Sequence, residues 1–254
     1  MTMSRIQKHG LHNSVVREIG RCIVSGELPQ GKPLPSESTL GSTLGVSRTA
    51  LREALRVLAA KGLVQAKQRT GTIVRLREAW NYLDPDVFAW RLDSIDYGRA
   101  VQELHELRYT IEPLAASLAA TRATAGDLAQ IADAYHEMQS ATDGATLVDP
   151  DVRFHRAIIS ASGNNLLASV GHVISIALRE YFKTSVTLLA DQIRSVSLHK
   201  IVLDEIKARN PAGASLAMRK VIEDSEEDAR RNAARRKRQA KLRKAHSVTL
   251  RRGR

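Results

Sequence analysis

Two side chains set one helical turn apart carry the clearest chemical signal in this sequence. Asp151 and His155 stand at positions i and i+4 of a stretch with a helical pattern, so a carboxylate and an imidazole can face one ion. Arg108, in an earlier helical stretch, has a guanidinium group that matches the two oxygens of a carboxylate. Arg179 is a candidate for a second donor to the same acid. Asp151 and His155 can thus form part of an ion site, and Arg108 can bind a carboxylate group.

Helices must position these side chains, because no stretch after residue 85 has the pattern of a strand. Seven helical patterns recur there, and Gly or Pro residues separate most of them. Short connections between the helices predict an all-α bundle of six to seven helices, whose centre can hold a small ligand or a metal ion. The predicted helices span residues 86–92, 98–121, 125–141, 149–162, 165–187, 193–209 and 211 into the C-terminal tail.

The first 75 residues carry a different pattern, that of a DNA-binding domain. An amphipathic helix is predicted at residues 13–25, and two short helical patterns follow, separated by a turn at Gly45. The second of these patterns has an apolar stripe at i, i+3, i+4 and i+7 that begins at Leu51. Two short strands around a basic turn follow within residues 63–74. Three helices and a two-stranded wing predict a winged helix-turn-helix, whose recognition helix can enter the major groove of DNA.

The side chains that face away from this apolar stripe are polar or basic. A lone arginine on a helix is usually a solvated charge, but a basic set that follows a glycine turn is typical of DNA contact. We therefore predict that DNA is contacted by the starts of the two short helices, by the exposed side of the second and by the turn of the wing. The predicted DNA-binding residues are Ser36, Ser38, Ser47, Arg48, Thr49, Arg52, Arg69, Thr70 and Gly71.

Charge is distributed unevenly along the 254 residues. The net charge is +9 over residues 1–77, −9 over residues 78–229 and +12 over residues 230–254. A basic N-terminal part can neutralise phosphates, whereas an acidic middle part should avoid them. The ligand of the helical bundle is therefore not expected to be DNA. No signal peptide or long apolar run is present, so we expect a soluble, cytoplasmic protein that does not enter a membrane.

Acidic residues precede Arg230 and Arg231 at helical spacings, so the last helix is predicted to continue for several turns, with disorder beyond about Lys244. This tail is either a solvated extension or a second, sequence-independent contact to phosphates. The patterns together predict four segments. These are a winged helix-turn-helix domain at residues 1–75, a linker with a short helix at 76–97, a helical domain at 98–229 that can hold a small ligand, and the basic tail at 230–254.

Residues 34–64, LPSESTLGSTLGVSRTALREALRVLAAKGLV, resemble the DNA-binding signature of the GntR-type bacterial regulators. The resemblance covers nearly all of the N-terminal domain and implies a protein that binds double-stranded operator DNA. Arg48 and Arg52 match the arginines with which that family contacts DNA. The chain departs from the family pattern at Ser38, where the family often has arginine, and at Arg69, where it often has glycine.

A second resemblance covers about residues 98–225 and is to the ligand-binding FCD domain of the FadR-type subfamily of these regulators. In that subfamily an Asp and a His one turn apart, with two later His, hold a divalent metal that presents a small carboxylate, and the domain supplies a homodimer. Asp151, His155 and His199 match three of the four ligand positions. The fourth falls on Val221, which cannot coordinate a metal ion.

Three interpretations of this pocket follow. Asp151, His155 and His199 can still hold Zn²⁺, Ni²⁺ or Mn²⁺ if water or effector oxygens complete the shell, although more weakly than four ligands would. Alternatively, the pocket binds its effector without a metal ion, through Arg108 and the two histidines. In the third interpretation, Asp151 and His155 form only a hydrogen bond on the helix surface, and His199 caps a neighbouring helix.

The aromatic stretch at residues 80–90, WNYLDPDVFAW, resembles the corresponding stretch of a sugar-acid-responsive regulator of this subfamily. The resemblance implies a repressor of a sugar-acid catabolic operon that leaves its operator when an effector such as an aldonate binds. An enzyme is the first alternative, because Asp151, His155 and His199 have the composition of a two-His-one-carboxylate iron site. No general base, nucleophile or Gly-rich phosphate loop accompanies them, so we expect no catalysis. The second alternative is an architectural DNA-binding dimer without an effector.

Overall fold

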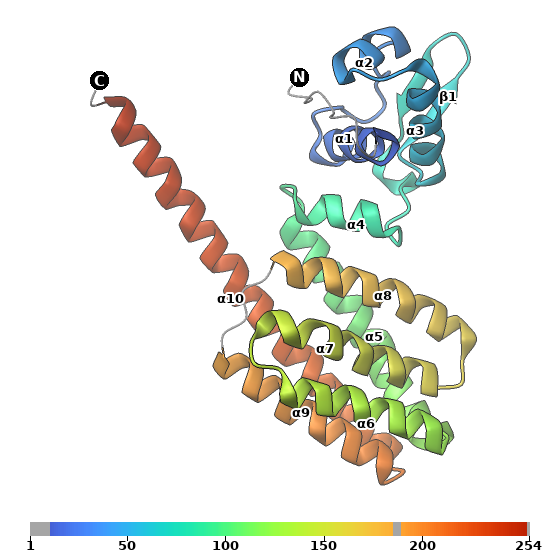
Figure 1. Cartoon of the computed structure of the whole chain (residues 1–254), viewed down its shortest axis with the longest axis vertical. Coiled ribbons are helices and arrows are strands. Elements are labelled where there is room, and N and C mark those ends of the chain that lie inside the picture. The colour runs from blue at the N-terminus through green and yellow to red at the C-terminus, as the bar shows by residue number, and fades with distance from the viewer. Residues whose placement is uncertain (1–10, 185–188, 253–254) are drawn as a thin grey trace. The chain divides into compact units, whose positions relative to one another are not determined.

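The computed structural model describes residues 11–184 and 189–252 of the chain (Figure 1). The chain divides into two compact units, residues 1–100 and 101–254, and each unit has its own hydrophobic core. The mainly α fold predicted from the sequence is confirmed, with an N-terminal winged helix-turn-helix followed by a helical domain. Within the two described ranges, no helix is both long enough and apolar enough to cross a membrane.

Three helices and a two-stranded wing build most of the N-terminal unit. The hydroxyl groups of Ser36 and Ser47 begin the two helices of the helix-turn-helix by accepting hydrogen bonds from backbone N–H groups three residues later. Gly45 ends the first of them in the left-handed conformation, with φ of 70°. The elements are α1 (Leu11–Ser25), α2 (Glu37–Leu44), α3 (Arg48–Ala60), β1 (Val64–Lys67) and β2 (Gly71–Val74), and the two strands pair antiparallel.

The helix α4 (Pro85–Leu92) belongs to the same unit and follows a short 3-10 turn, η1 (Arg77–Ala79). It packs against α1, and its Trp90 lies so close to Gly20 that a Cβ atom at Gly20 would stand 2.3 Å from the ring. Trp90 is 5% exposed and is part of the N-terminal hydrophobic core. Much of the segment predicted as a linker at residues 76–97 is therefore packed into the N-terminal unit.

A partly buried cation joins α4 to the end of α3. The Lys61 ammonium, 12% exposed, donates to Asp84 at 2.9 Å and lies 2.7 Å from an Asp86 oxygen. Asp84 also caps α4 by accepting hydrogen bonds from its first backbone N–H groups. Burial lowers the pKa of Lys61, but its hydrogen bonds to the two aspartates outweigh burial and raise that pKa above its ordinary value. The ammonium therefore stays charged and holds the two helices together.

Six helices form the second unit, within the number predicted. α7 packs against α6 and α8, while α9 packs against α6 and α10. Alanines of α5 at positions 116, 119 and 120 are fully buried and let the neighbouring helices approach closely. The helices are α5 (Tyr97–Arg122), α6 (Ala125–Ser140), α7 (Gly144–Ala161), α8 (Asn165–Thr184), α9 (Leu189–Lys207) and α10 (Pro211–Arg252).

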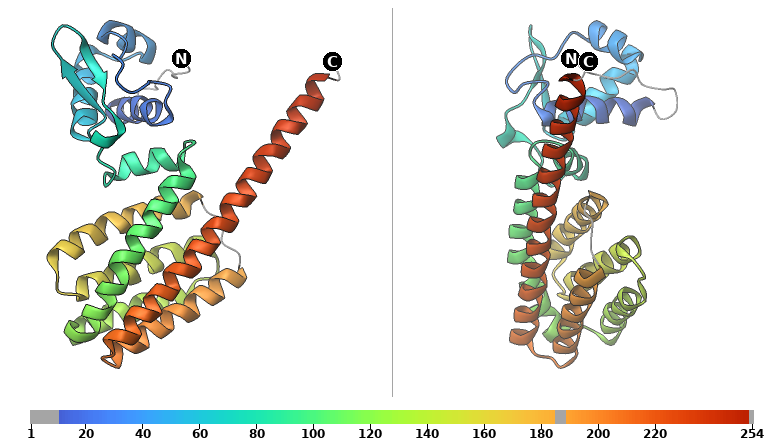
Figure 2. Two further views of the ribbon diagram at one scale, coloured as in Figure 1. Left: turned by 180° about the vertical axis from the view of Figure 1, so that it is seen from behind. Right: turned by 90° about the vertical axis from the view of Figure 1, so that its left-hand side faces the viewer.

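Several helices of this unit differ in extent from the prediction. α9 begins at Leu189 and not at residue 193, and the predicted end of the preceding helix at residue 187 lies outside the described residues. α7 begins at Gly144 and not at Asp149, because Asp143 and Thr146 form a reciprocal capping box that starts the helix earlier. α10 runs as one helix to Arg252, beyond Lys244, where we predicted disorder (Figure 2). Its last turns lack Gly and Pro before Gly253 and consist largely of Ala, Arg, Lys and Gln, which have high helix propensity.

Candidate functional site

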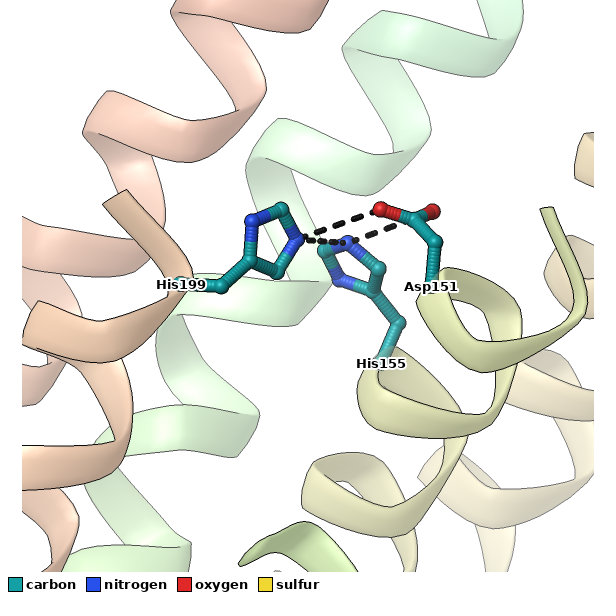
Figure 3. A group of neighbouring side chains, drawn as sticks. All are labelled: Asp151, His155 and His199. Carbon is teal, nitrogen blue, oxygen red and sulfur yellow. Dashed lines mark hydrogen bonds and ion pairs between the residues drawn. The ribbon is translucent and has the colours of Figure 1, made fainter. Parts of the chain in front are cut away.

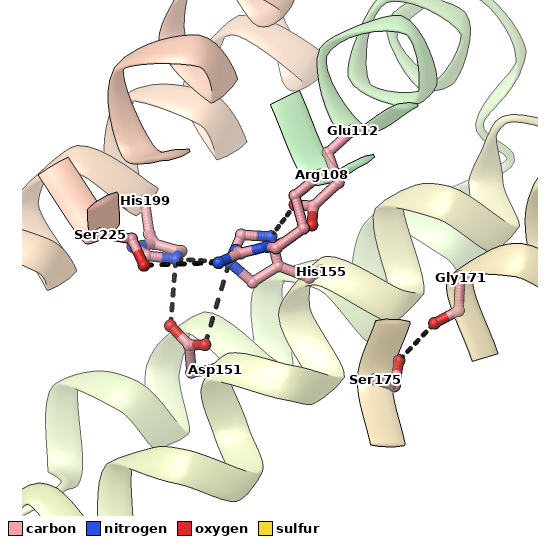
Figure 4. Close-up of polar contacts among 8 residues, drawn as sticks. All are labelled: Arg108, Glu112, Asp151, His155, Gly171, Ser175, His199 and Ser225. Atoms are coloured by element: carbon pink, nitrogen blue, oxygen red, sulfur yellow. Dashed lines mark hydrogen bonds and ion pairs between the residues drawn. The ribbon is translucent and has the colours of Figure 1, made fainter. Parts of the chain in front are cut away.

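Three helices of the second unit bring four buried polar side chains together (Figure 4). α7 supplies Asp151 and His155, which share a face because they lie one turn apart. α9 supplies His199 and α5 supplies Arg108. These side chains are only 1–6% exposed, so their polar atoms face one another and not the solvent.

Asp151, His155 and His199 form a compact group, which we call the Asp–His–His cluster (Figure 3). Nε2 of His199 lies 3.1 Å from Nε2 of His155 and 3.3 Å from Oδ1 of Asp151. Nε2 of His155 lies 3.9 Å from Oδ2 of Asp151. One potential ligand atom from each of the three residues lies within 4.8 Å of the others, so a single ion can touch all three.

A partner on the far side of each imidazole orients the ring. Nδ1 of His199 donates to the backbone carbonyl of Ser195 at 2.7 Å, since a carbonyl oxygen can only accept. Nδ1 of His155 lies 2.5 Å from Oε2 of Glu112. Such partners place the proton on Nδ1 and leave the Nε2 lone pair directed into the cluster, as in metal sites where a carboxylate or carbonyl supports each histidine ligand.

This arrangement fits a divalent transition-metal ion. Two Nε2 lone pairs only 3.1 Å apart repel each other unless a proton or a cation stands between them. Two imidazoles and a carboxylate are a donor set suited to Zn²⁺, Ni²⁺ or Mn²⁺. Val221 is 4% exposed and lines the adjoining cavity, so its side chain adds no fourth protein ligand there.

Arg108 borders the Asp–His–His cluster and is itself 1% exposed. Its guanidinium donates to Oε1 of Glu112 at 2.7 Å and to Oγ of Ser225 at 3.4 Å, and Nη2 lies 3.3 Å from Nε2 of His155. Glu112 therefore contacts both Arg108 and His155, and it fixes the two side chains relative to each other (Figure 4). The Arg108 guanidinium is therefore a positively charged group at the edge of the Asp–His–His cluster.

Two buried carboxylates carry negative charge in this site. Burial raises the pKa of Glu112, but the Arg108 guanidinium and His155 outweigh burial and hold that pKa at about 2. Burial also raises the pKa of Asp151, but its hydrogen bond with His199 and its electrostatic interactions with the neighbouring side chains outweigh burial and lower that pKa below the ordinary value. With neutral imidazoles, two carboxylates and one guanidinium leave a net charge of about −1, which a divalent cation changes to about +1.

A cavity of about 60 Å³ adjoins the cluster and is lined by side chains from α5, α7, α8, α9 and α10. Arg108 and Ser225 lie in its wall beside the acidic residues Asp224 and Asp228, while Tyr181, Phe182 and Val221 supply apolar surface. The wall is of mixed polarity, and its polar groups converge from several helices on one small space, as in a site that orients a small ligand.

Arg179 does not reach this cavity, contrary to the prediction that it is a second pocket donor. Its side chain is 42% exposed and donates to Asp149 at 2.9 Å. The sequence interpretation also left Glu112, Ser195 and Ser225 without a role. Glu112 carried a usable signal, because it follows Arg108 by one helical turn. The two serines carried none, since their contacts depend on how α9 and α10 pack.

The predicted DNA-binding residues all lie on the exposed surface of the N-terminal unit. Two of them, Ser36 and Ser47, also cap their helices. Arg52 forms an exposed ion pair with Glu37 at 2.9 Å, and Arg69 has a left-handed backbone with φ of 62°. A glycine adopts that conformation without strain, so the structure gives a physical reason why related wings often carry glycine at the Arg69 position.

Two known domain families match this chain. The FCD domain matches residues 103–224, and the family described as bacterial regulatory proteins, gntR family, matches residues 11–74. The two matches fall on the helical unit that holds the cavity and on the winged helix-turn-helix.

Individual relatives cover most of the chain. It is 34% identical over 215 residues to the galactonate operon transcriptional repressor of Escherichia coli strain K12, across 83% of this chain and 93% of the relative. It is 37% identical over 202 residues to the HTH-type transcriptional regulator LutR of Bacillus subtilis strain 168, across 77% and 90%. A solved structure of Lar, which controls the expression of the Listeria monocytogenes agr system, has a TM-score of 0.62 at 18% identity over 90% of this chain and 99% of that one; this likeness concerns the fold alone.

Proposed function

The chain belongs to the gntR family of bacterial regulatory proteins and carries an FCD domain, and on that premise we propose that it is a repressor released from its operator by a small sugar acid. The observation that carries this proposal is the buried Arg108 beside the Asp–His–His cluster, at the wall of a cavity in the FCD domain. The relatives are transcriptional regulators and not enzymes, which removes the iron-oxygenase alternative.

A carboxylate is the ligand group that this chemistry favours. The guanidinium of Arg108 can form paired hydrogen bonds with two carboxylate oxygens. An aldonate or a related sugar acid is the proposed effector, because the relative named for the galactonate operon aligns along 93% of its length. Polar groups such as Ser225 on the cavity wall suit the hydroxyl groups of such an acid.

Asp151, His155 and His199 would hold one Zn²⁺, Ni²⁺ or Mn²⁺ ion per subunit. A bound divalent ion supplies a Lewis acid that attracts carboxylate and hydroxyl oxygens. The chain's own contribution is orientation, since Ser195 and Glu112 hold the two rings with Nε2 facing the cluster. The buried Asp151 carboxylate adds the negative charge that favours a cation here.

On the DNA side, we propose that a homodimer places two winged helices on a palindromic operator, in the bacterial cytoplasm. The FCD domain supplies the dimer. Effector binding favours a domain arrangement that spaces the recognition helices wrongly for the operator. A coupling of about 1–3 kcal/mol per site is sufficient for such control.

The DNA-binding face is tested with variants of α3. Arg48→Ala and Arg52→Ala should abolish operator binding while leaving the melting temperature nearly unchanged, because an exposed ion pair such as Arg52–Glu37 contributes little stability. Arg153→Ala, which removes an exposed ion pair with Glu137 in the FCD domain, is the matched control and should bind normally. A large fall in melting temperature for the first two variants would assign them a structural role instead.

The effector site is tested by a thermal-shift screen of aldonic, uronic and 2-hydroxy acids, with and without Zn²⁺, Ni²⁺ or Mn²⁺. At least one sugar acid should raise the melting temperature and release operator DNA. Arg108→Lys keeps a charge beside Glu112 but loses the paired hydrogen bonds, so it should bind the operator and ignore the acid. Arg179→Lys, outside the cavity, should respond normally. If no acid changes DNA binding, the protein is an architectural dimer.

A further inference from the structure

One buried histidine close to the cavity has no partner for its polar atoms. His105 lies on α5, one turn before Arg108, and is 3% exposed. Among the residues that the structure describes, neither of its ring nitrogens has a hydrogen-bond partner. An unpaired buried donor or acceptor loses the hydrogen bonds it would make with water, so packing alone does not account for an imidazole at this position.

The surroundings of His105 connect it to the cavity wall. Its ring meets the ring of Tyr181 edge to face, with centroids 6.1 Å apart and planes at 83°. Tyr181 and Arg108 both line the cavity, so His105 contacts one lining residue and lies one helical turn from another. Burial lowers the pKa of His105 to about 3, and the nearby charges of Arg108 and Arg230 act in the same direction. The ring is therefore neutral and offers one N–H donor and one nitrogen acceptor.

A donor and an acceptor on one neutral ring match a hydroxyl group, which both donates and accepts. We propose that His105 is a specificity-determining residue that binds a hydroxyl group of a polyhydroxy acid whose carboxylate is held at Arg108. This rests on the function proposed above and narrows its ligand to acids with a hydroxylated chain. The two ring nitrogens of His105 that lack partners would then form hydrogen bonds with a hydroxyl group of the effector.

The distance between His105 and Arg108 determines how long an acid must be for its hydroxyl group to reach His105. Side chains three residues apart on a helix lie about 5–6 Å from each other. With single bonds of about 1.5 Å, a carbon chain must extend for several bonds beyond its carboxylate to cover that distance. A six-carbon aldonate has hydroxyl groups there, whereas a three-carbon 2-hydroxy acid ends too early. His105 should therefore discriminate between these two classes of acid.

Two acids and three variants of the full-length protein test this proposal. Dissociation constants for galactonate and for lactate are measured by calorimetry with the wild type, His105→Phe, His105→Gln and His172→Gln. The Phe variant keeps a ring against Tyr181 but has no polar atoms, and the Gln variant keeps a donor and an acceptor. His172, exposed on α8, is the matched control.

His105→Phe should weaken galactonate binding about tenfold, because one hydrogen bond is lost. It should leave lactate binding unchanged. His105→Gln should retain most of the affinity for galactonate, and His172→Gln should match the wild type. An unchanged galactonate affinity in His105→Phe, an equal loss for both acids, or a wild type that prefers lactate would each overturn the role of His105. A wild type that binds no carboxylate at all would instead overturn the proposed function.

A second measurement does not depend on the folding of the Phe variant. The ¹⁵N chemical shifts of the His105 ring in the wild type should change from unbonded to hydrogen-bonded values when galactonate is added. Lactate should leave them unchanged. Ring shifts that stay the same with saturating galactonate would reject the contact.

Discussion

Among single residues, Val221 marks the difference between this pocket and a four-ligand metal site. Val221→His should place a third imidazole at the wall of the cavity and raise the affinity for Zn²⁺ on the order of tenfold or more. Competition with a chelator of known affinity measures this change. Val221→Ala enlarges the cavity without adding a ligand and is the control. Equal Zn²⁺ affinity in Val221→His and the wild type would show that the position does not face the ion.

Two buried groups should make the stability depend on pH. The pKa of His105 falls from 6.5 to about 3, so the unfolded chain gains a proton below pH 6.5 that the folded chain does not bind. The pKa of Glu112 falls from 4.5 to about 2, so its contribution is present above pH 4.5 and is lost as the pH falls toward 2. Each effect lowers the free energy of unfolding on acidification, by up to about 1.4 kcal/mol per pH unit.

The variant His105→Phe separates these two contributions. Between pH 6.5 and 4.5 its free energy of unfolding, measured by urea denaturation, should fall less steeply than that of the wild type. Below pH 4.5 both proteins should lose stability, because Glu112 is intact in each. Parallel curves over the upper range would mean that His105 is protonated in the folded protein.

The residues of the site were only partly predictable from the sequence. The i, i+4 spacing of Asp151 and His155 indicated a shared face, the guanidinium chemistry of Arg108 indicated a carboxylate donor, and the family resemblance added His199. The contact of Glu112 with His155 was not predictable, because it depends on how α5 and α7 pack. Arg179 shows the converse, since a helical arginine carries no signal that separates a pocket donor from a surface ion pair.

At the scale of elements, the contact between α1 and α4 is unusually tight. Gly20→Ala should destabilise the protein by about 1–3 kcal/mol, because the added Cβ would overlap the Trp90 ring. Helix propensity alone predicts the opposite sign, since Ala stabilises a helix relative to Gly. Chemical denaturation measures the difference. Gly98→Ala is the matched control, because no atom lies near its added Cβ, and it should be neutral or stabilising.

The type and order of the elements followed from periodicity and turn residues, but their ends did not. Pro150 and Gly144 both have the signature of breaks, yet α7 begins at Gly144 and contains Pro150. The capping box at Asp143 prevails over these local preferences. Likewise, α4 has a helical pattern in the sequence, but its contacts with Gly20 and Lys61 show that it belongs to the DNA-binding unit.

At the scale of the whole molecule, the net charge of each segment indicates whether that segment can bind DNA. Deleting residues 236–254 should lower the affinity for any duplex by a similar factor and leave the operator preference unchanged, because this basic segment of α10 has no acidic residue. The slope of log affinity against log salt should become shallower. Binding to an operator and to an unrelated duplex measures both effects.

A variant that replaces the Lys and Arg residues of this segment with Gln is the control for the charge. It keeps the length and the helix propensity of α10 and should reproduce the effect of the deletion. A wild-type salt slope in either variant would leave the tail as a solvated extension.

The packing of α4 also decides where this regulator can be recombined with others. A chimera cut after Val74 would strip Trp90 from α1 and leave the Lys61 ammonium without Asp84 and Asp86. Such a chimera would expose apolar surface and leave a partly buried charge without its partners, so it should express poorly. A biosensor built on this DNA-binding unit should therefore keep the residues up to the end of α4 and join the new sensor domain after Leu92.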